Sequence, residues 1–276
     1  MTTPRLAAVA HARSFLFVPA NRPERLTKAL DAGADAVIVD LEDAVPVTEK
    51  DAAREALATQ AALLHSATTP VLIRLNDSDA DLQWFAQSGL RVDAIMWPKA
   101  SAPEALRGVV DAIGPVGLVP LIESVSGYLN LGAIAAVPGV TRLALGHIDF
   151  MADSGISCSD DERELDPLRF ALSLHSRAQQ LPPPIDGVTV AVKDTQRLNL
   201  DTQRALRFGF GGKLCIHPAQ VAGVHAAMRP SDAEMDWAQR VLAADRNSDG
   251  AAVQVDGQMV DRPVVLRAQT LLQRAG

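Results

Sequence analysis

The chain alternates short apolar segments with longer segments in which apolar residues recur at helical spacing. The short segments are rich in β-branched and aromatic residues and are bounded by Gly, Pro, Asn or Asp, which is typical of buried strands. The longer segments are rich in Ala, Leu, Arg and Glu, which is typical of helices that cover a sheet. The pattern predicts strands over residues 14–19, 36–41, 71–76, 94–99, 117–124, 142–149, 185–190 and 213–218. It predicts helices over residues 23–33, 48–65, 79–88, 103–113, 167–181 and 195–209.

This succession of strand and helix units predicts an α/β protein with a (β/α)8 TIM-barrel fold. A doubly wound open sheet is the alternative, but it normally has fewer strands and a glycine-rich turn after the first strand. Here that turn reads VPANRPER, over residues 18–25, and contains no GxGxxG motif. The barrel is therefore the favoured fold.

The repeating pattern ends after the eighth unit, so we divide the chain into a catalytic barrel over residues 1–225 and a C-terminal extension over residues 226–276. The extension begins with a predicted helix over residues 232–245. Asp256 and Gly257 then form the turn of a predicted hairpin, and a further helix follows. The extension is too short for an independent domain, and we expect it to pack on the barrel or on a neighbouring subunit.

The composition sets limits on the partners and the compartment. Hydrophobic residues make up 48% of the 276 residues, which is enough for a large core, and the net charge of -7 argues against nucleic-acid or anionic-membrane partners. The two cysteines, Cys158 and Cys215, have neither metal-ligand nor disulfide spacing. No segment has the layout of a signal peptide or the length of a transmembrane helix. We therefore expect a cytoplasmic protein that binds neither membranes nor nucleic acids.

Charged residues follow the predicted strands with a regularity that indicates a functional site. A charge at the end of a buried strand is unfavourable unless it is paired or used in chemistry. In a closed parallel barrel the carboxyl ends of all strands meet at one face, where the active sites of such barrels lie. The residues concerned are Glu42, Asp43, Arg74, Lys99, Glu123 and Asp149.

Two of these acids, Glu123 and Asp149, follow consecutive predicted strands and should therefore be neighbours. Two carboxylates completed by water and a chelating ligand suit Mg2+, which often takes only one or two protein ligands, and no cluster of His or Cys supports zinc. The structural alternative is that both acids form salt bridges with arginines such as Arg142. Lys99 after a predicted strand suggests Schiff-base chemistry. A metal ion held by Glu123 and Asp149 would already stabilise an enolate, so a Schiff base at the same site would be redundant. A surface or salt-bridged lysine is the favoured interpretation.

Several motifs, in order along nearly the whole chain, resemble those of the citrate lyase beta-subunit family in the HpcH/HpaI aldolase superfamily. The longest is RSFLFVPANRPERLTKALDAGADAVIVDLEDAV, over residues 13–45. The others are IRLN (73–76), WPK (97–99), LIESVSGYLN (121–130), ALGHIDFMADSGI (144–156), IDGV (185–188), GFGGKLCIHPAQV (209–221) and DGQMVDRPVV (256–265). The family includes malyl-CoA and citramalyl-CoA lyases. The resemblance therefore implies a Mg2+-dependent barrel that makes or breaks a carbon–carbon bond beside a thioester, in a homo-oligomer that is commonly a trimer or a hexamer.

The resemblance also assigns roles by position. Glu123 and Asp149 match the family's metal ligands. Arg74 matches an arginine that binds the oxo-acid and polarises a carbonyl oxygen, and Arg13 matches a second arginine at the same site. On the residues alone, Arg74 could instead pair with Glu42 or Asp43 in the barrel mouth, and Arg13 could be a surface charge.

Three further acids match catalytic positions of the family. Glu42 and Asp43 match an acidic pair near the metal-bound water. Asp261 matches an aspartate that a neighbouring subunit contributes in some members, where it exchanges a proton with the acetyl methyl group. On the residues alone, Asp261 before Arg-Pro could simply cap the last helix.

Together these features predict a carbon–carbon lyase that cleaves a 3-hydroxyacyl-CoA thioester by retro-Claisen chemistry, with CoA thioesters and 2-oxo acids as substrates. Citramalyl-CoA, giving acetyl-CoA and pyruvate, is the favoured substrate, followed by malyl-CoA, giving acetyl-CoA and glyoxylate. The alternatives are a citrate lyase beta subunit acting on citryl-ACP, a condensing enzyme with an added thioesterase step, a metal-dependent aldolase on free 2-oxo acids, and a metabolite-binding subunit without enzymatic activity.

Overall fold

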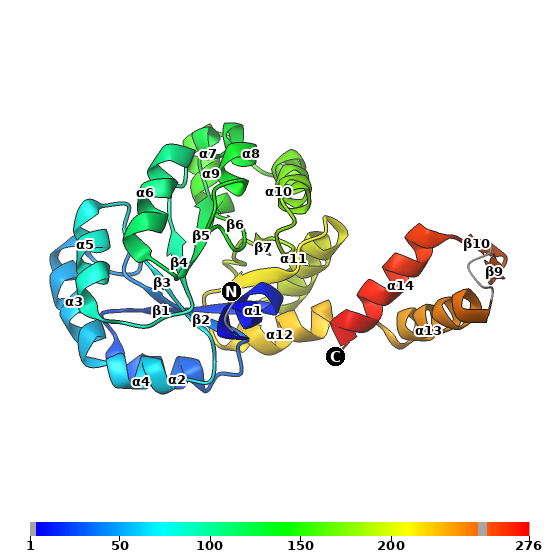
Figure 1. The fold of residues 1–276 in the computed structure, drawn as a ribbon, viewed down its shortest axis with the longest axis horizontal. Helices are drawn as coiled ribbons and strands as arrows, with labels where there is room; N and C mark the ends of the chain where they lie inside the picture. Colours follow the sequence, from blue (N-terminus) through cyan, green and yellow to red (C-terminus); the bar gives the residue numbers. More distant parts are fainter. Residues whose placement is uncertain (1–3, 248–252, 276) are drawn as a thin grey trace. The chain divides into compact units, whose positions relative to one another are not determined.

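The computed structural model describes residues 4–247 and 253–275 of a chain that divides into two compact units, Met1–His225 and Ala226–Gly276. In the first unit, parallel strands β1 to β8 close into a barrel in which β1 pairs with both β2 and β8. Helices surround the strands (Figure 1), so the predicted (β/α)8 fold is confirmed. The strands are β1 (Ser14–Pro19), β2 (Ala36–Asp40), β3 (Val71–Arg74), β4 (Ala94–Trp97), β5 (Gly117–Ile122), β6 (Ala144–Leu145), β7 (Ile185–Asp186) and β8 (Gly212–Cys215).

The helices of this unit begin and end largely where local signals place them. Ser78 accepts a hydrogen bond from the main chain of Asp81 at the start of α5, and Gly89 ends that helix with φ 69 in the left-handed region. The α-helices of the unit are α1 (Pro4–His11), α2 (Leu26–Leu30), α3 (Lys50–Thr59), α4 (Ala61–Ser66), α5 (Asp79–Ser88), α6 (Pro103–Ile113), α7 (Val125–Leu129), α8 (Leu131–Ala135), α9 (His147–Ser154), α10 (Asp166–Ala178), α11 (Thr195–Arg207) and, running into the second unit, α12 (Ala219–Met228).

Several boundaries differ from the sequence predictions. The sixth strand was expected over residues 142–149, but β6 holds only two residues because Gly146 starts helix α9. The helix expected over residues 48–65 is two helices, α3 and α4, interrupted at Gln60. Helix α1 precedes the first strand and was not predicted.

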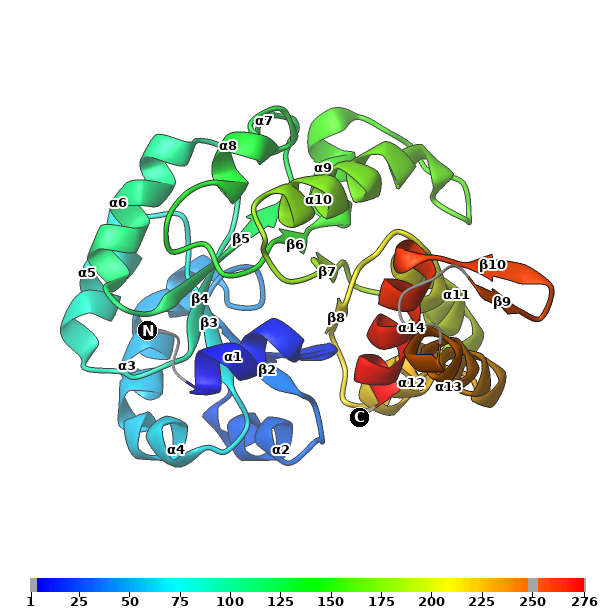
Figure 2. The same cartoon turned by 45° about the vertical axis from the view of Figure 1, so that its right-hand side comes forward.

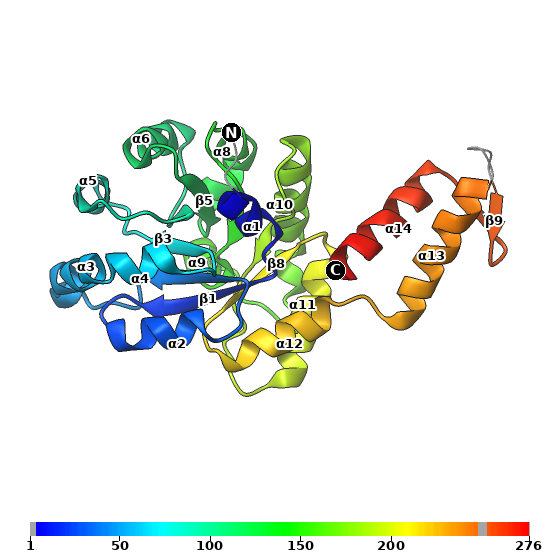
Figure 3. The same cartoon turned by 60° about the horizontal axis from the view of Figure 1, so that its bottom comes forward.

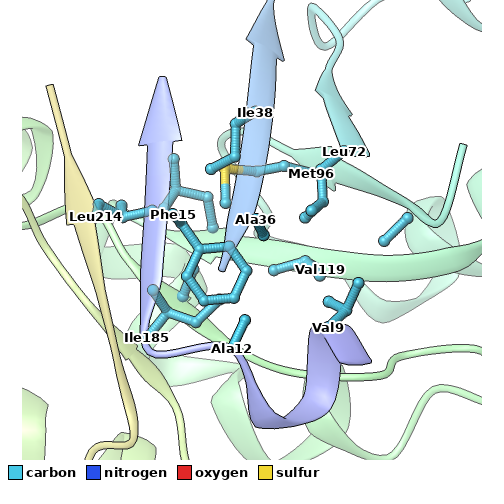
Figure 4. Close-up of a cluster of buried hydrophobic side chains, with 13 residues drawn as sticks. Val9, Ala12, Phe15, Ala36, Ile38, Leu72, Met96, Val119, Ile185 and Leu214 are labelled. Atoms are coloured by element: carbon cyan, nitrogen blue, oxygen red, sulfur yellow. The ribbon is translucent and has the colours of Figure 1, made fainter. Parts of the chain in front are cut away.

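Apolar side chains on the inward face of the strands fill the barrel (Figure 4). Successive strand residues point to opposite faces, so every second residue contributes to this core. Val9 and Ala12 come from α1 and its end and belong to the same cluster, so the segment around α1 covers the amino ends of the strands. The strand residues of the core are Phe15, Ala36, Ile38, Leu72, Ala94, Met96, Val119, Leu121, Ala144, Ile185 and Leu214.

Arg142 fastens α1 to the barrel. Arg142 is 1% exposed, and its guanidinium donates to the carbonyl oxygens of Val9 at 3.0 Å, Ala12 at 2.8 Å and Pro183 at 2.7 Å. It also lies 5.3 Å from the centre of the Phe15 ring. Carbonyl groups at the end of a helix lack partners within the helix and need other donors. Arg142 supplies them at the end of α1 and thereby holds this segment against the amino ends of the strands.

The second unit contains two helices, α13 (Asp232–Asn247) and α14 (Arg262–Ala275), and the hairpin of β9 (Val253–Val255) and β10 (Gln258–Val260). The helices pack side by side (Figure 3). The hairpin turn consists of Asp256 and Gly257, which both have positive φ, 52 and 77, as a tight hairpin turn requires. How this unit packs against the barrel or a neighbouring subunit stays a prediction.

None of the helices within residues 4–247 and 253–275 is both long and apolar enough to cross a membrane.

Candidate metal and substrate site at the carboxyl ends of the strands

Charged side chains continue the inward face of the strands at one end of the barrel. Asp40 stands two residues after Ile38, Arg74 two residues after Leu72, and Glu123 two residues after Leu121. Because side chains two residues apart point to the same side of a strand, the apolar layer of the core is followed by a charged layer. These charges are buried: Asp40 is 1% exposed, Arg74 8% and Glu123 3%.

Arg74 lies at the centre of an ionic cluster. Its Nε and Nη2 donate to the two carboxylate oxygens of Asp40 at 2.7 and 2.6 Å, a two-point contact that fixes the guanidinium plane. Its Nη1 lies 2.8 Å from Oε2 of Glu42 and donates to Asp43 at 3.4 Å, while the guanidinium stacks 4.9 Å from the Phe17 ring centre. Burial acts to lower the pKa of Arg74, but the hydrogen bonds and charge of Asp40 outweigh it and raise that pKa. Arg74 is therefore a permanent cation.

The carboxylate of Glu42 has two cationic neighbours but lacks a hydrogen bond at one of its oxygens. The ammonium of Lys99 lies 3.1 Å from Glu42 Oε1. The other oxygen, Oε2, is buried and makes no hydrogen bond of good geometry despite its closeness to Arg74. Burial, and the charge of Asp43, raise the pKa of Glu42 against the opposing effect of Arg74. A buried carboxylate with an incompletely paired oxygen can accept a proton or a further cationic ligand.

Glu123 is fixed by its surroundings at both oxygens. Oε1 accepts a hydrogen bond of 2.7 Å from the main-chain N–H of Lys99. Oε2 lies against Gly146, where an added Cβ would be only 2.5 Å away. Burial raises the pKa of Glu123 to about 8; the Lys99 N–H opposes this, and the charges of Glu42 and Asp149 add to it. Glu123 is thus a buried carboxylate whose charged form is disfavoured by its surroundings.

Asp149 lies in the first turn of helix α9 and not at the end of a strand, which corrects the predicted strand over residues 142–149. Negative charge is favourable there because of the orientation of the helix dipole. On the same helix, one turn further, Asp153 accepts a hydrogen bond of 2.7 Å from the main chain of Val125, the first residue of α7. Helices α7, α8 and α9 lie together beyond β5 and β6 (Figure 2). The helix that carries Asp149 is thereby tied to the segment that follows Glu123.

Arg13 does not reach this site. It precedes β1, so it lies at the amino ends of the strands, and its Nε pairs with Asp35 at 3.3 Å while its main-chain N–H donates to the same oxygen at 2.7 Å. The expectation that Arg13 binds substrate beside Arg74 is corrected by this position, because residues before and after parallel strands lie at opposite ends of the barrel.

Two residues of the site, Asp40 and Gly146, were missed from the sequence, and one contact of Lys99 was not foreseen. Asp40 is a charge inside the apolar run AVIVD, which is itself a signal that it points into the barrel mouth. Gly146 is required by the closeness of Glu123, a constraint that exists only after folding. Lys99 pairs with an acid at the rim, as the favoured interpretation held, but its contact with Glu123 through the main chain was not foreseen.

Arg142 binds carbonyl oxygens at the other end of the barrel, so the alternative in which it forms salt bridges with Glu123 and Asp149 fails.

Asp261 belongs to the second unit. It is exposed, and its side chain accepts a hydrogen bond of 3.2 Å from the main chain of Val264 at the start of α14. It therefore caps this helix, as the sequence alternative stated. The cap uses one carboxylate oxygen among the described residues, and a role of Asp261 in proton transfer stays a prediction.

The residues present fit a hard divalent cation. No group of three or more His, Cys, Asp or Glu side chains in the described ranges is arranged to hold a metal without help. Glu123 and Asp149 would thus supply two ligands, with water and substrate supplying the rest, which is the usual situation for Mg2+. Burial disfavours the charged form of Glu123, and Oε2 of Glu42 is buried without a hydrogen bond, so a cation bound at this rim would stabilise both carboxylates. The described acids of the rim are Asp40, Glu42, Asp43, Glu123 and Asp149, against the cations Arg74 and Lys99.

A second ionic cluster holds the loop between α9 and α10. Glu162, whose φ is 50, lies 2.6 Å from Arg169 and 2.8 Å from Arg204, and Arg197 lies 3.1 Å away. His147 in the first turn of α9 is 3.8 Å from the same carboxylate. These contacts tie the loop to α10 and α11, although His147 Nδ1 and Arg204 Nε are buried without a hydrogen bond.

Known proteins resemble this chain over nearly its whole length. The model of the family described as HpcH/HpaI aldolase/citrate lyase matches residues 13–218. A citrate lyase subunit beta-like protein of Mycobacterium tuberculosis is 36% identical over 279 residues, covering 95% of each chain. A (3S)-malyl-CoA thioesterase of Cereibacter sphaeroides is 34% identical over 272 residues, covering 95% of this chain and 94% of that protein. The crystal structure of CitE from M. tuberculosis in complex with magnesium, acetoacetate and coenzyme A has a TM-score of 0.83 and 34% identity, covering 97% of this chain and 99% of that one. The chain belongs to the HpcH/HpaI aldolase/citrate lyase family.

Proposed function

We propose that this protein is a Mg2+-dependent carbon–carbon lyase that cleaves a 3-hydroxyacyl-CoA thioester, with citramalyl-CoA as the first candidate substrate and malyl-CoA as the second. The observation that carries the proposal is the buried carboxylate of Glu123, fixed by the Lys99 main-chain N–H and acted on by the charges of Glu42, Asp149 and Arg74. The similar CitE structure contains magnesium, acetoacetate and coenzyme A, which supports a metal and a CoA thioester at this rim.

Glu123 and Asp149 would hold the ion. A Mg2+ ion held there would stabilise negative charge on the oxygen of the substrate's 3-hydroxyl group, which becomes the carbonyl oxygen of the 2-oxo acid. The hydroxyl group of the substrate must lose its proton for cleavage to begin. Glu42 accepts this proton, because its pKa is raised by burial and one of its oxygens lacks a hydrogen bond.

Arg74 supports the charge that develops next. As the carbon–carbon bond breaks, its electron pair moves onto the thioester, whose carbonyl oxygen becomes an enolate oxygen. Arg74 is held in place by two hydrogen bonds from its own side chain to Asp40, so its charge is oriented before the reaction starts. The remaining fragment leaves as a 2-oxo acid, whose carboxylate suits a fixed guanidinium.

The enolate carbon must finally take up a proton to form acetyl-CoA. Asp261 of a neighbouring subunit supplies it in this proposal, within a homotrimer or a hexamer. The exposure of Asp261 in its own unit supports such a role, because a carboxylate that caps a helix with one oxygen can present the other to a partner.

The test is a product screen with the purified protein. The protein with Mg2+ is incubated separately with citramalyl-CoA, with malyl-CoA and with citryl thioesters of CoA and of acyl carrier protein, and the products are identified by mass spectrometry. Acetyl-CoA with pyruvate or glyoxylate supports the lyase, whereas turnover that persists in EDTA contradicts it. Glu123→Gln, which keeps the volume of the side chain, is the matched control and should be inactive.

Thioester hydrolysis is the second candidate, because a relative with 34% identity is named (3S)-malyl-CoA thioesterase. The same ligands would chelate a malyl group, and water would attack the thioester carbonyl. The screen separates the two reactions: hydrolysis releases free CoA and intact malate, whereas cleavage releases acetyl-CoA and glyoxylate. Exclusive turnover of the carrier-protein thioester would instead indicate a citrate lyase beta subunit. Turnover of free 2-oxo acids alone would indicate an aldolase, and binding without turnover a metabolite-binding subunit.

A further inference from the structure

Lys99 has an unusual main-chain conformation for a residue with a side chain. Its φ of 51 lies in the left-handed region, which is unfavourable for residues other than glycine. The neighbouring backbone holds it there. The main-chain N–H of Ala100 donates to the carbonyl oxygen of Leu121 at 3.3 Å, and helix α7 packs so closely that a Cβ on Gly127 would lie 2.4 Å from the Ala100 carbonyl oxygen. Strained positions of this kind persist where the surrounding structure fixes them, and they concentrate at functional sites.

This conformation directs the Lys99 main-chain N–H at Glu123. The N–H donates to Glu123 Oε1 at 2.7 Å, while Glu123 Oε2 lies against Gly146. A hydrogen bond from the main chain of a neighbouring strand end is more rigid than one from a mobile side chain. The orientation of the carboxylate therefore depends on the left-handed turn at Lys99.

The side chain of Lys99 contacts a different acid. Its ammonium lies 3.1 Å from Oε1 of Glu42, and the hydrogen bond to Glu42 raises the pKa of Lys99. The lysine side chain is 60% exposed, whereas that of Glu42 is 6% exposed. One residue thus bridges two buried carboxylates of the site, Glu123 through its main chain and Glu42 through its side chain.

We propose that Lys99 is a positioning residue of the metal site: its left-handed main chain orients Glu123 toward the cation, and its ammonium holds Glu42 beside Arg74. The inference rests on the proposed function and goes beyond it, because it assigns to this lysine neither Schiff-base chemistry nor contact with the substrate.

Two variants of similar size test the main-chain role. Lys99→Asn and Lys99→Val both lose the ammonium, but asparagine tolerates the left-handed region and a β-branched valine does not. Titration calorimetry with Mg2+ alone should show the affinity of Lys99→Asn within about threefold of the unchanged protein and that of Lys99→Val at least about tenfold weaker, as for residues that orient metal ligands. Equal affinities of the two variants would overturn the main-chain role.

The ammonium is tested by comparing Lys99→Asn with Lys99→Arg, with Lys28→Met on the exposed face of α2 as the control for loss of a lysine charge. Without the ammonium Glu42 is less well fixed, so kcat of Lys99→Asn should fall by about tenfold or more while KM changes little, and Lys99→Arg should restore kcat. An unchanged kcat in Lys99→Asn would overturn the role of the ammonium.

A measurement without metal settles the main-chain contact even where Lys99→Val does not fold. Hydrogen exchange at the Lys99 amide should be at least about tenfold faster in Glu123→Ala than in the unchanged protein, and Glu104→Ala, an exposed acid on α6, should leave it unchanged. The same rate in all three proteins would refute the proposal. Failure of the unchanged protein to bind Mg2+ would instead count against the proposed function, and the exchange result would still decide the role of Lys99.

Discussion

Gly146 and Glu123 are in direct contact at the rim of the barrel. A Cβ added to Gly146 would lie 2.5 Å from Oε2 and 2.6 Å from Cβ of Glu123. The φ of Gly146 is -105, which any residue can adopt, so glycine is required here by the closeness of the Glu123 side chain and, at 3.3 Å, of Leu121 Cγ. The position of Glu123 thus depends on the absence of a side chain at the start of α9.

Gly146→Ala should therefore displace Glu123. We expect Mg2+ affinity to fall by about tenfold or more and the free energy of unfolding to fall by about 1–3 kcal/mol from the steric conflict. Calorimetry and urea unfolding measure the two effects. Gly108→Ala in α6 is the matched control, because an added Cβ there meets nothing within 4 Å; it should stabilise the helix by about 0.5–1 kcal/mol and leave Mg2+ affinity unchanged. Normal Mg2+ binding by Gly146→Ala would contradict the assignment of Glu123 as a ligand.

The raised pKa of Glu123 makes metal binding depend on pH. A pKa of about 8 means that Glu123 is protonated at neutral pH in the absence of metal. The ion and the proton then compete, so the apparent Mg2+ affinity should rise with pH and be ~100-fold higher at pH ~9 than at pH ~6. Calorimetry in two buffers of different ionisation enthalpy should show about one proton released per ion bound at pH ~7. Affinity that does not vary over this range would place the bound ion elsewhere.

Arg74 cannot be exchanged for lysine without loss. Lysine offers a point charge in place of the two-point contact with Asp40, so Arg74→Lys should lower kcat by about 100-fold, as for loss of an oriented cation. Arg74→Met leaves Asp40 buried without its cation, and Glu42 with Lys99 alone, and should destabilise the protein by about 3–5 kcal/mol. Adding Asp40→Asn to Arg74→Met should recover part of this free energy of unfolding. Kinetics of Arg74→Lys that match the unchanged protein would remove Arg74 from the reaction.

The capping and catalytic roles of Asp261 can be separated. Asparagine caps helices as well as aspartate does, so Asp261→Asn should keep the free energy of unfolding within about 0.5 kcal/mol. It cannot transfer the proton, so exchange of the acetyl-CoA methyl protons in heavy water should slow by about 100-fold. Asp261→Ala, which loses the cap at Val264, should slow exchange equally and also lose about 1 kcal/mol of stability. Unchanged exchange in Asp261→Asn would leave this residue with the capping role alone.

Sharing of the site between subunits predicts complementation. Mixed oligomers of Asp261→Asn and Glu123→Gln chains should regain activity that neither variant has alone, because some sites then combine an intact Glu123 with an intact Asp261 of the partner chain. The mixing is verified by native mass spectrometry. Demonstrably mixed oligomers without activity would show that each chain forms its site by itself.

The sequence determined the features that depend on local periodicity. Alternation of period two along each strand separates the core from the outer face, and it carries Arg74 and Glu123 to the inward face two residues beyond Leu72 and Leu121. The pair Asp256 and Gly257 determines its hairpin turn because both residues tolerate positive φ. These properties need no knowledge of distant segments.

The tertiary structure decided which charges meet. Arg74 takes Asp40 as its main partner because β2 and β3 pair in parallel in a register that places the two residues opposite one another. Arg13 lies at the opposite end and pairs with Asp35. The place of Arg13 before β1 by itself indicates the amino ends of the strands, whereas the motif resemblance indicates the substrate site at the carboxyl ends. The contacts of Lys99 and Gly146 with Glu123 join segments far apart in the sequence and depend on ångström-scale spacing of backbones, which no local pattern encodes. Local sequence therefore fixes the face on which a side chain lies, whereas long-range packing selects its partner.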